Sequence, residues 1–232
     1  MIFQAMFAVI TPALIIGAFA ERVRYGPLLL FIALWSLLVY APVAHWVWGI
    51  DGWLHEMGVL DFAGGMVVHM AAGTAALASA LVLRPRHGFN GSVVEPENVP
   101  LVVLGAALLW FGWFGFNAGS ALAAGGLAAL AFTNTFLATA AAGLTWTVVT
   151  WLVRGKSSVL GAMAGLVAGL VAITPAAGFV DPVSSMAIGV VAGLATYGAA
   201  LLRVRMRLDD SLDVWAVHGM GGMWGAIATG IF

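Results

Sequence analysis

Two histidines, His69 and His218, carry the chemistry that most needs explaining in this sequence, because each lies in a long apolar segment. An imidazole can donate or accept a hydrogen bond and can take up a proton near neutral pH. Within a membrane, such a titratable side chain is costly and usually faces a pathway or a partner. Either histidine alone could be a core residue with its hydrogen bonds satisfied, but two at similar depth favour a functional pair.

An aspartate precedes each histidine, in LDFAGGMVVH over residues 60–69 and in LDVWAVH over residues 212–218. A carboxylate near the start of a helix can accept free backbone N–H groups and complement the helix dipole. We prefer this structural role for Asp61 and Asp213 over direct contact with a cation. Similar motifs on antiparallel helices are typical of inverted repeats, which place a substrate site between the repeats at mid-depth. The match is short, and the spacing from aspartate to histidine differs.

Two other chemistries fit the histidine pair less well. A metal site lacks a third ligand at the same depth. An intramembrane enzyme that used the pair as acid and base would need a nucleophile or a metal set, and neither accompanies it. The chain has no cysteine, which excludes disulfides and thiolate metal sites. We therefore predict no enzyme activity, metal or cofactor, and we interpret His45, His55 and His87 as interfacial residues.

The elements that position these residues are membrane helices. Hydrophobic residues make up 62% of the 232 residues and charged residues only 8%, against roughly 25% in soluble domains. Uncharged stretches long enough to cross a hydrocarbon core of about 30 Å recur along the chain. The fold class is therefore an all-α, polytopic membrane helix bundle. We predict eight membrane helices, over residues 1–20, 26–48, 62–83, 99–153 with a break at 123–126, 159–180, 182–202 and 214–232.

The few charges indicate how this bundle is oriented. All nine basic residues fall in four clusters that occupy every second connection, at residues 22–24, 84–86, 154–156 and 203–207. The intervening connections carry acidic residues but no Lys or Arg. The positive-inside rule then places the basic connections in the cytoplasm. The first helix runs inward and the last runs outward.

This orientation gives each residue an approximate depth, at a rise of about 1.5 Å per residue. Phe7 and Phe116 lie in the outer third, Ser120 lies one turn further out, and Trp48 closes its helix at the outer end. Both histidines lie near the middle of the membrane. From composition alone, Phe7 and Phe116 would be core aromatics, while Trp48 and Trp113 would be interface and packing residues.

Four motifs in order resemble those of the Amt/Mep/Rh ammonium transporter family. They are FQAMFAVITP at residues 3–12, DFAGGMVVH at 61–69, FGWFGFNAGS at 111–120 and DDSLDVWAVHGMGG at 209–222. They are similar to motifs of the family's third, fifth, sixth and tenth helices, and together they cover essentially the whole chain. Trp48 and the FGWFGFN segment are similar to the Amt/Mep branch rather than the Rh branch.

The resemblance implies a fold of eleven membrane helices, in two inverted five-helix halves plus a final helix. Subunits would form a homotrimer in the plasma (inner) membrane, with one pore each. The eight predicted helices would be the third to tenth, so we expect residues 1–232 to be a single but partial transporter domain. The chain also starts inside a predicted helix and ends within an apolar pattern, and we expect it to be a fragment.

The resemblance also implies roles for individual residues in ammonium transport. Trp48 and Ser120, with Phe7, match the family's outer recruitment site for ammonium. Phe7 and Phe116 match a stacked pair that closes the pore below that site, and Trp113 matches an aromatic beside the pair.

His69 and His218 match the twin histidines that line the family's narrow apolar pore. Bare ammonium in such a lumen would lose far more solvation energy than local contacts return, whereas neutral ammonia would lose only hydrogen bonds. The resemblance thus implies ammonium at the mouth and ammonia, or separated ammonia and proton, within. Potassium cannot give up a proton, which would supply selectivity.

Two alternatives stay open at this point. The pocket could serve an ammonium sensor that signals through an attached domain or partner, or the chain could be a non-functional fragment of a transporter. In the family, a PII-type nitrogen regulatory protein is the cytoplasmic partner and docks on cytoplasmic loops and a tail. We predict no nucleic-acid partner.

Overall fold

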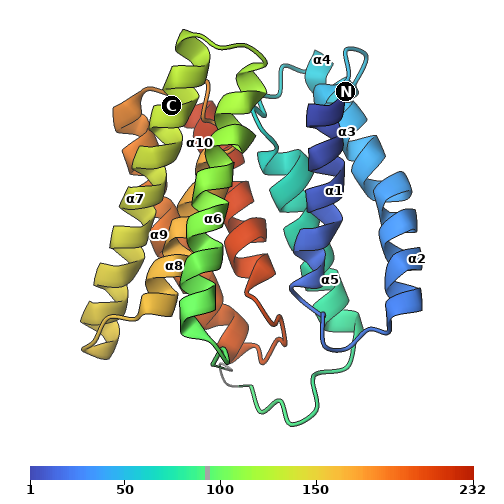
Figure 1. Cartoon of the computed structure of the whole chain (residues 1–232), viewed down its shortest axis with the longest axis vertical. Helices are drawn as coiled ribbons and strands as arrows, with labels where there is room; N and C mark the ends of the chain where they lie inside the picture. The colour runs from blue at the N-terminus through green and yellow to red at the C-terminus, as the bar shows by residue number, and fades with distance from the viewer. Residues whose placement is uncertain (92–94) are drawn as a thin grey trace.

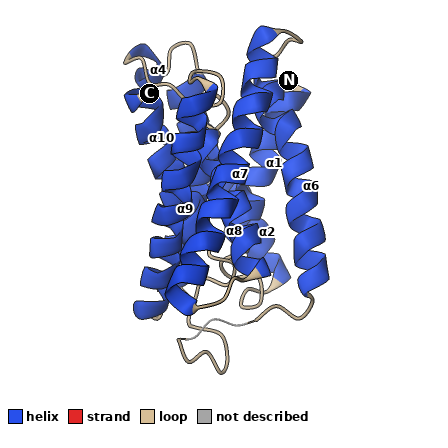
Figure 2. Cartoon of the chain, turned by 90° about the vertical axis from the view of Figure 1, so that its left-hand side faces the viewer, coloured by secondary structure: helices blue, strands red, loops and turns tan. Residues whose placement is uncertain are grey.

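The computed structural model describes residues 1–91 and 95–232, and over these residues the regular structure is entirely helical. The helices stand side by side in one bundle, and helical rods that follow one another in the chain run in opposite directions (Figures 1 and 2). Their bounds are α1 (Ile2–Ile16), α2 (Tyr25–Trp35), η1 (Ser36–Tyr40), α3 (Ala41–Trp48), α4 (Trp53–Glu56), η2 (Gly65–Met70), α5 (Ala71–Val82), α6 (Val99–Asn117), η3 (Ala118–Ala121), α7 (Gly126–Arg154), α8 (Val159–Ile173), α9 (Pro182–Arg205), η4 (Trp215–Met220) and α10 (Gly221–Ile231).

The prediction of a membrane helix bundle is confirmed. Three π-helical turns continue directly into α-helices, so that α2–η1–α3, η2–α5 and η4–α10 each form one rod. Five helical segments within the described residues are long and apolar enough to cross a membrane, and they cover Tyr25–Glu56, Gly65–Val82, Val99–Ala121, Gly126–Arg154 and Pro182–Arg205. The apolar helices α1 and α8 and the rod η4–α10 are shorter.

The structure differs from the predicted helix at residues 159–180, because α8 ends at Ile173 and turns follow up to residue 179. Pro175 cannot supply a backbone N–H to continue the helix. Its carbonyl instead accepts a hydrogen bond from the N–H of Phe62 at 3.0 Å. This contact ties the turn after α8 to the segment that leads into η2.

Local sequence explains where several helices begin. The Asn98 side chain accepts from the N–H of Leu101 and starts α6, and the Ser158 hydroxyl does the same for α8. The predicted break at residues 123–126 is confirmed, since α7 begins at Gly126. Within the rod α2–η1–α3, the wide π-turn η1 ends two residues before Pro42, whose ring would otherwise clash with the preceding helical turn.

The bundle has two groups of helices that meet along the rods η2–α5 and η4–α10. In Figure 1 the blue and teal helices α1 to α5 occupy one side, and the green to red helices α6 to α10 occupy the other. One buried cluster lies mainly within the first group, around Phe7, Trp35 and Val68, and two lie mainly within the second. The two meeting rods bring His69 and His218 face to face.

The connections after α1, α5, α7 and α9 all lie at the lower end of the bundle in Figure 1. These are the connections that carry the four basic clusters. The alternation predicted from the sequence is therefore present in the fold. Which side of a membrane this basic end faces stays a prediction.

Candidate functional site

The two histidines lie in contact at the centre of the bundle. Nδ1 of His69 and Nδ1 of His218 are 3.2 Å apart, and the ring centroids are 5.2 Å apart. His69 is fully buried, and His218 is 9% exposed. At this distance one Nδ1 donates a hydrogen and the other accepts it. Two imidazolium ions would each present a donor there, so the geometry suits a pair that holds at most one positive charge.

A continuous line of ring contacts leads from the histidines toward the end of the bundle opposite the basic loops. The Phe116 ring stacks on His69, with a centroid separation of 5.9 Å. Phe7 lies against Phe116 at 4.7 Å, and Trp48 meets Phe7 edge-on at 5.6 Å. Four helical rods, α1, α2–α3, η2–α5 and α6, therefore each supply one member of a chain of rings that ends at His218.

Trp113 flanks this line on the side of α6. Its ring stacks on His69 at 5.4 Å with an interplanar angle of 16°, and on Phe116 at 5.0 Å. Its indole N–H donates to the Thr174 hydroxyl at 3.0 Å, and that hydroxyl donates to the Leu170 carbonyl. The hydrogen bonds fix the ring in the orientation that stacks on the imidazole.

Trp48 and Ser120 are each held by a backbone carbonyl next to the line of rings. The Trp48 indole N–H donates to the Asp61 carbonyl at 2.8 Å. The Ser120 hydroxyl donates to the Phe116 carbonyl, one turn earlier, at 2.9 Å. The sequence-predicted aromatic residues and histidines are thus brought together, with Ser120 anchored beside them.

Asp61 caps the helix that carries His69. Its two carboxylate oxygens accept four backbone N–H groups, from Gly64, Gly65, Met66 and Val67, at 2.6 to 3.2 Å. These are the free donors that every helix start presents. The carboxylate is therefore fully occupied by the first turn of η2, as the structural interpretation of Asp61 predicts.

Asp213 does not cap its helix as Asp61 does. Its carboxylate lies 2.5 Å from Nε of Arg203, and its backbone has a φ of 56°. The capping carboxylate is instead that of Asp210, which accepts the N–H of Trp215 at 2.7 Å. Burial raises the pKa of Asp210 to about 6, although its backbone hydrogen bonds oppose that shift. Sequence reasoning missed this residue.

A signal for Asp210 was present in the spacing. Asp61 and Asp210 each precede their histidine by eight residues. The third residue after each aspartate has a positive φ, 111° at Gly64 and 56° at Asp213. Both motifs then enter a π-helical turn that contains the histidine. The two rods therefore repeat one local design with equal spacing, once Asp210 replaces Asp213 in the comparison.

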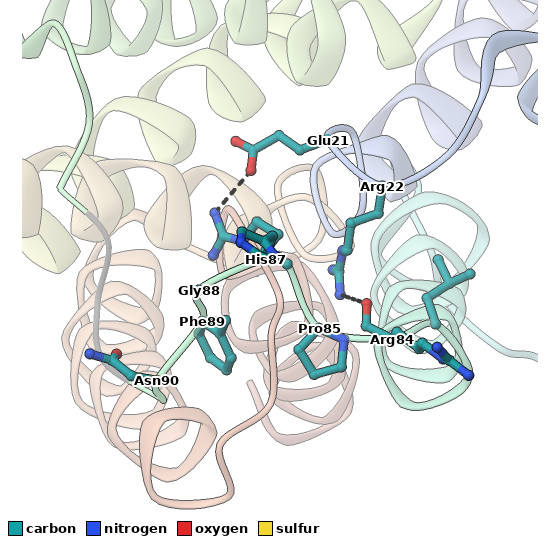
Figure 3. Close-up of a pocket in the computed structure, with 10 residues that line it drawn as sticks. Glu21, Arg22, Arg84, Pro85, His87, Gly88, Phe89 and Asn90 are labelled. Carbon is teal, nitrogen blue, oxygen red and sulfur yellow. Dashed lines mark hydrogen bonds and ion pairs between the residues drawn. The ribbon is translucent and has the colours of Figure 1, made fainter.

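An ionic cluster, here called the clasp, joins three connections at the basic end. The buried carboxylate of Asp209 lies 2.7 Å from Nη2 of Arg86 and 3.5 Å from Nη1 of Arg22. Burial alone would raise the pKa of Asp209, but hydrogen bonds from Arg86 and the charges of both arginines lower it overall. Nη1 of Arg86 also lies 3.4 Å from the Glu21 carboxylate at the edge of the cluster, and Figure 3 shows the residues around it, with Glu21, Arg22 and Arg84 labelled. A cavity of about 690 Å³ opens beside it.

Comparison with known proteins identifies the chain. The family model described as "Ammonium Transporter Family" matches residues 1–232. The chain belongs to the ammonium transporter family. It is 52% identical over 231 residues to the ammonium transporter Amt1 of Archaeoglobus fulgidus and 53% identical over 233 residues to an ammonium transporter of Bacillus subtilis. Each comparison covers 100% of this chain, and 59% and 57% of those relatives.

Solved structures of the family share the fold. The crystal structure of Candida albicans Mep2 matches with a TM-score of 0.94 and 45% identity, over 99% of this chain and 51% of that one. A structure titled "Sensor Amt Protein" matches with a TM-score of 0.94 and 36% identity, over 99% of this chain and 60% of that chain. The chain thus spans between half and three fifths of the length of these family members.

Proposed function

We propose that this chain forms the pore region of an ammonium transporter, in which ammonium is recruited outside and passes inward along the line of rings. The observation that carries this proposal is the unbroken contact from Trp48 through Phe7 and Phe116 to the histidine pair. Family membership supports ammonium as the substrate. The positive-inside rule supports a cytoplasmic position for the basic end and an outer position for Trp48.

In this proposal Trp48, Ser120 and Phe7 form the recruitment site. An ammonium ion over an aromatic face gains roughly 0.5–2 kcal/mol, with more gained when the site is desolvated. The Ser120 hydroxyl donates its hydrogen to the Phe116 carbonyl, so its lone pairs stay available for an ammonium N–H. The substrate would thus be recognised as a cation that is also a hydrogen-bond donor.

Phe7 and Phe116 act as the gate, with Trp113 beside them. Their ring centroids are 4.7 Å apart, so the rings are in contact and a substrate can pass only if they move. Beyond the gate, a bare cation loses its hydration shell in an apolar surrounding, whereas ammonia loses only hydrogen bonds. Potassium has no proton to give up and would be rejected there.

His69 and His218 line the path beyond the gate. Their Nδ1 atoms bond to each other, and Nε2 of His69 has no hydrogen-bond partner among the residues that the structure describes. The imidazoles can therefore offer a hydrogen bond to ammonia and relay a proton. Two imidazoles that share one hydrogen bond can bind ammonia and relay a proton without placing a fixed charge in the lumen.

We also propose the family's assembly for this protein: a homotrimer in the plasma (inner) membrane, open to regulation by a PII-type protein at the basic end. The arginine-rich connections there provide a charged surface for such a partner. A sensor role is the alternative that the flux experiment below separates from transport.

The test is ammonium-dependent current or pH change in proteoliposomes, with the protein in the longest natural form that contains these 232 residues. We expect flux with ammonium and none with potassium at the same concentration. His69→Ala and His218→Ala should change the flux severalfold, while circular dichroism stays that of the unaltered protein.

Two results would contradict the proposal. Ammonium binding without any flux would replace transport with a sensor function. Flux that is unchanged in both histidine variants would remove the pair from the path, even if transport itself is found.

A further inference from the structure

Each histidine is followed after four residues by a glycine, Gly73 in one rod and Gly222 in the other. The two glycines lie at the crossing of the rods, next to the opposite histidine. A Cβ placed on Gly222 would lie 2.9 Å from Cβ of His69 and 2.9 Å from the Gly65 carbonyl oxygen. A Cβ on Gly73 would lie 2.2 Å from the backbone N of Gly219 and 3.0 Å from the carbonyl carbon of His218.

These contacts leave no room for a methyl group, because nearly all of the atoms approached belong to backbone. Carbon atoms in contact normally stay about 3.5–4.0 Å apart. A flexible side chain could rotate away from an added methyl, but the backbone of a packed helix cannot. An alanine would therefore push one rod from the other at the level of the imidazoles.

Other glycines of the last rod do not approach the histidine rod as Gly222 does. Gly225 faces a different neighbour, the Ala172 carbonyl in α8. Gly230 meets no atom of another segment within 4 Å among the described residues. Only Gly219 and Gly222 in this rod approach the rod that carries His69 at its backbone, and Gly222 approaches the histidine itself.

We propose that Gly222 and Gly73 are positioning residues that set the separation of the twin imidazoles. The inference rests on the proposed function of the pair and adds the device that fixes its spacing. The arrangement is reciprocal, since the glycine after each histidine allows close approach to the backbone that carries the other. The Nδ1 atoms are 3.2 Å apart, at the long end of hydrogen-bond distances, so a small separation of the rods breaks their bond.

The test compares Gly222→Ala and Gly73→Ala with Gly230→Ala as a matched control in the same rod as Gly222. The first readout is ¹⁵N solid-state NMR of histidine-labelled protein in bilayers, which reports the hydrogen bond between the two Nδ1 atoms. We expect that signal to be lost in Gly222→Ala and Gly73→Ala and kept in Gly230→Ala.

The second readout separates maximal flux from half-saturation. We expect about tenfold lower maximal ammonium flux in the two variants, since misplacement by about 1 Å can cost up to about 10²-fold at a positioned site. The half-saturating ammonium concentration should stay unchanged, because neither glycine touches Trp48, Phe7 or Ser120. A general loss of folding would lower both the NMR signal and the amount of protein recovered. It would not lower the maximal flux selectively while the half-saturating concentration stays the same.

The proposal is overturned if Gly222→Ala keeps both the Nδ1–Nδ1 signal and the maximal flux of Gly230→Ala. If Gly73→Ala does not fold, Gly222→Ala alone tests the proposal. The added methyl group of Gly222→Ala would meet its closest neighbour at 2.9 Å, which is a milder clash than the 2.2 Å at Gly73. Unchanged flux in His69→Ala and His218→Ala would instead refute the proposed role of the pair in the path, so the two failures are distinguishable.

Discussion

At the scale of single residues, Trp48 makes two contacts through different atoms, and in the proposed function each contact has its own role. Its ring meets Phe7 edge-on, and its indole N–H is held by the Asp61 carbonyl. In the proposed recruitment site the ring would attract ammonium, while the hydrogen bond from the N–H orients the ring. A substitution that removes one role at a time can tell them apart.

We predict that Trp48→Leu raises the half-saturating ammonium concentration by roughly two- to thirtyfold, the equivalent of a lost cation–π contact of about 0.5–2 kcal/mol. Trp48→Phe keeps an aromatic face and should raise it less. Initial rates of ammonium flux in proteoliposomes over a range of concentrations measure both variants. Equal values for Trp48→Leu and the unaltered protein would contradict the recruitment role.

At the scale of elements, the rod that carries His69 depends on one buried carboxylate. Asp61 satisfies four N–H groups at the start of η2, where no water is expected to replace it. A buried donor left without a partner costs about 1–3 kcal/mol. By comparison, Asp181 caps α9 at an exposed position, where water can replace its side chain.

We predict that Asp61→Ala lowers the free energy of unfolding by at least about 2 kcal/mol, because several buried donors lose their acceptor. Asp181→Ala is the matched control and should lower it less. Unfolding in mixed detergent micelles, followed by circular dichroism, measures both variants. If Asp181→Ala lowered the free energy of unfolding more than Asp61→Ala, the cap on η2 would not be the more stabilising of the two.

At the scale of the whole molecule, the clasp around Asp209 connects segments that are far apart in sequence. Arg22 follows α1, Arg86 follows α5, and Asp209 follows α9. The clasp therefore ties the first group of helices to the second at the basic end. Because the pKa of Asp209 lies below its usual value, the folded protein favours the ionised form more than the unfolded chain does.

The sign of the pH dependence follows from that shift. The contribution of Asp209 to stability is fully present above the unfolded-state pKa of about 4 and is lost as pH falls through the lower folded pKa. We predict that Asp209→Asn lowers the thermal unfolding midpoint at pH 7 and that this difference shrinks below about pH 4. Asp51→Asn, at an exposed carboxylate, should show no such difference, and a pH-independent gap for Asp209→Asn would contradict the ionic explanation.

Local properties of the sequence were enough to predict the bundle. Long uncharged stretches, the break before Gly126 and four basic clusters in alternate connections depend only on residue type and order. They determined the fold class, the number of rods and the gathering of basic residues at one end. The four motifs also contain Phe7, His69, Phe116 and His218, which the fold brings together, because each motif lies within a single segment of the chain.

Only the tertiary structure decided which carboxylate caps the rod that carries His218 and how closely the two histidines meet. Asp210 rather than Asp213 takes the cap, since Asp213 is drawn to Arg203 on another helix. The 3.2 Å contact between the imidazoles depends on two rods that approach at glycines 149 residues apart in the chain. Such distances are set by packing between segments, where displacements of a few tenths of an ångström decide whether a bond forms, and residue order alone carries no measure of them.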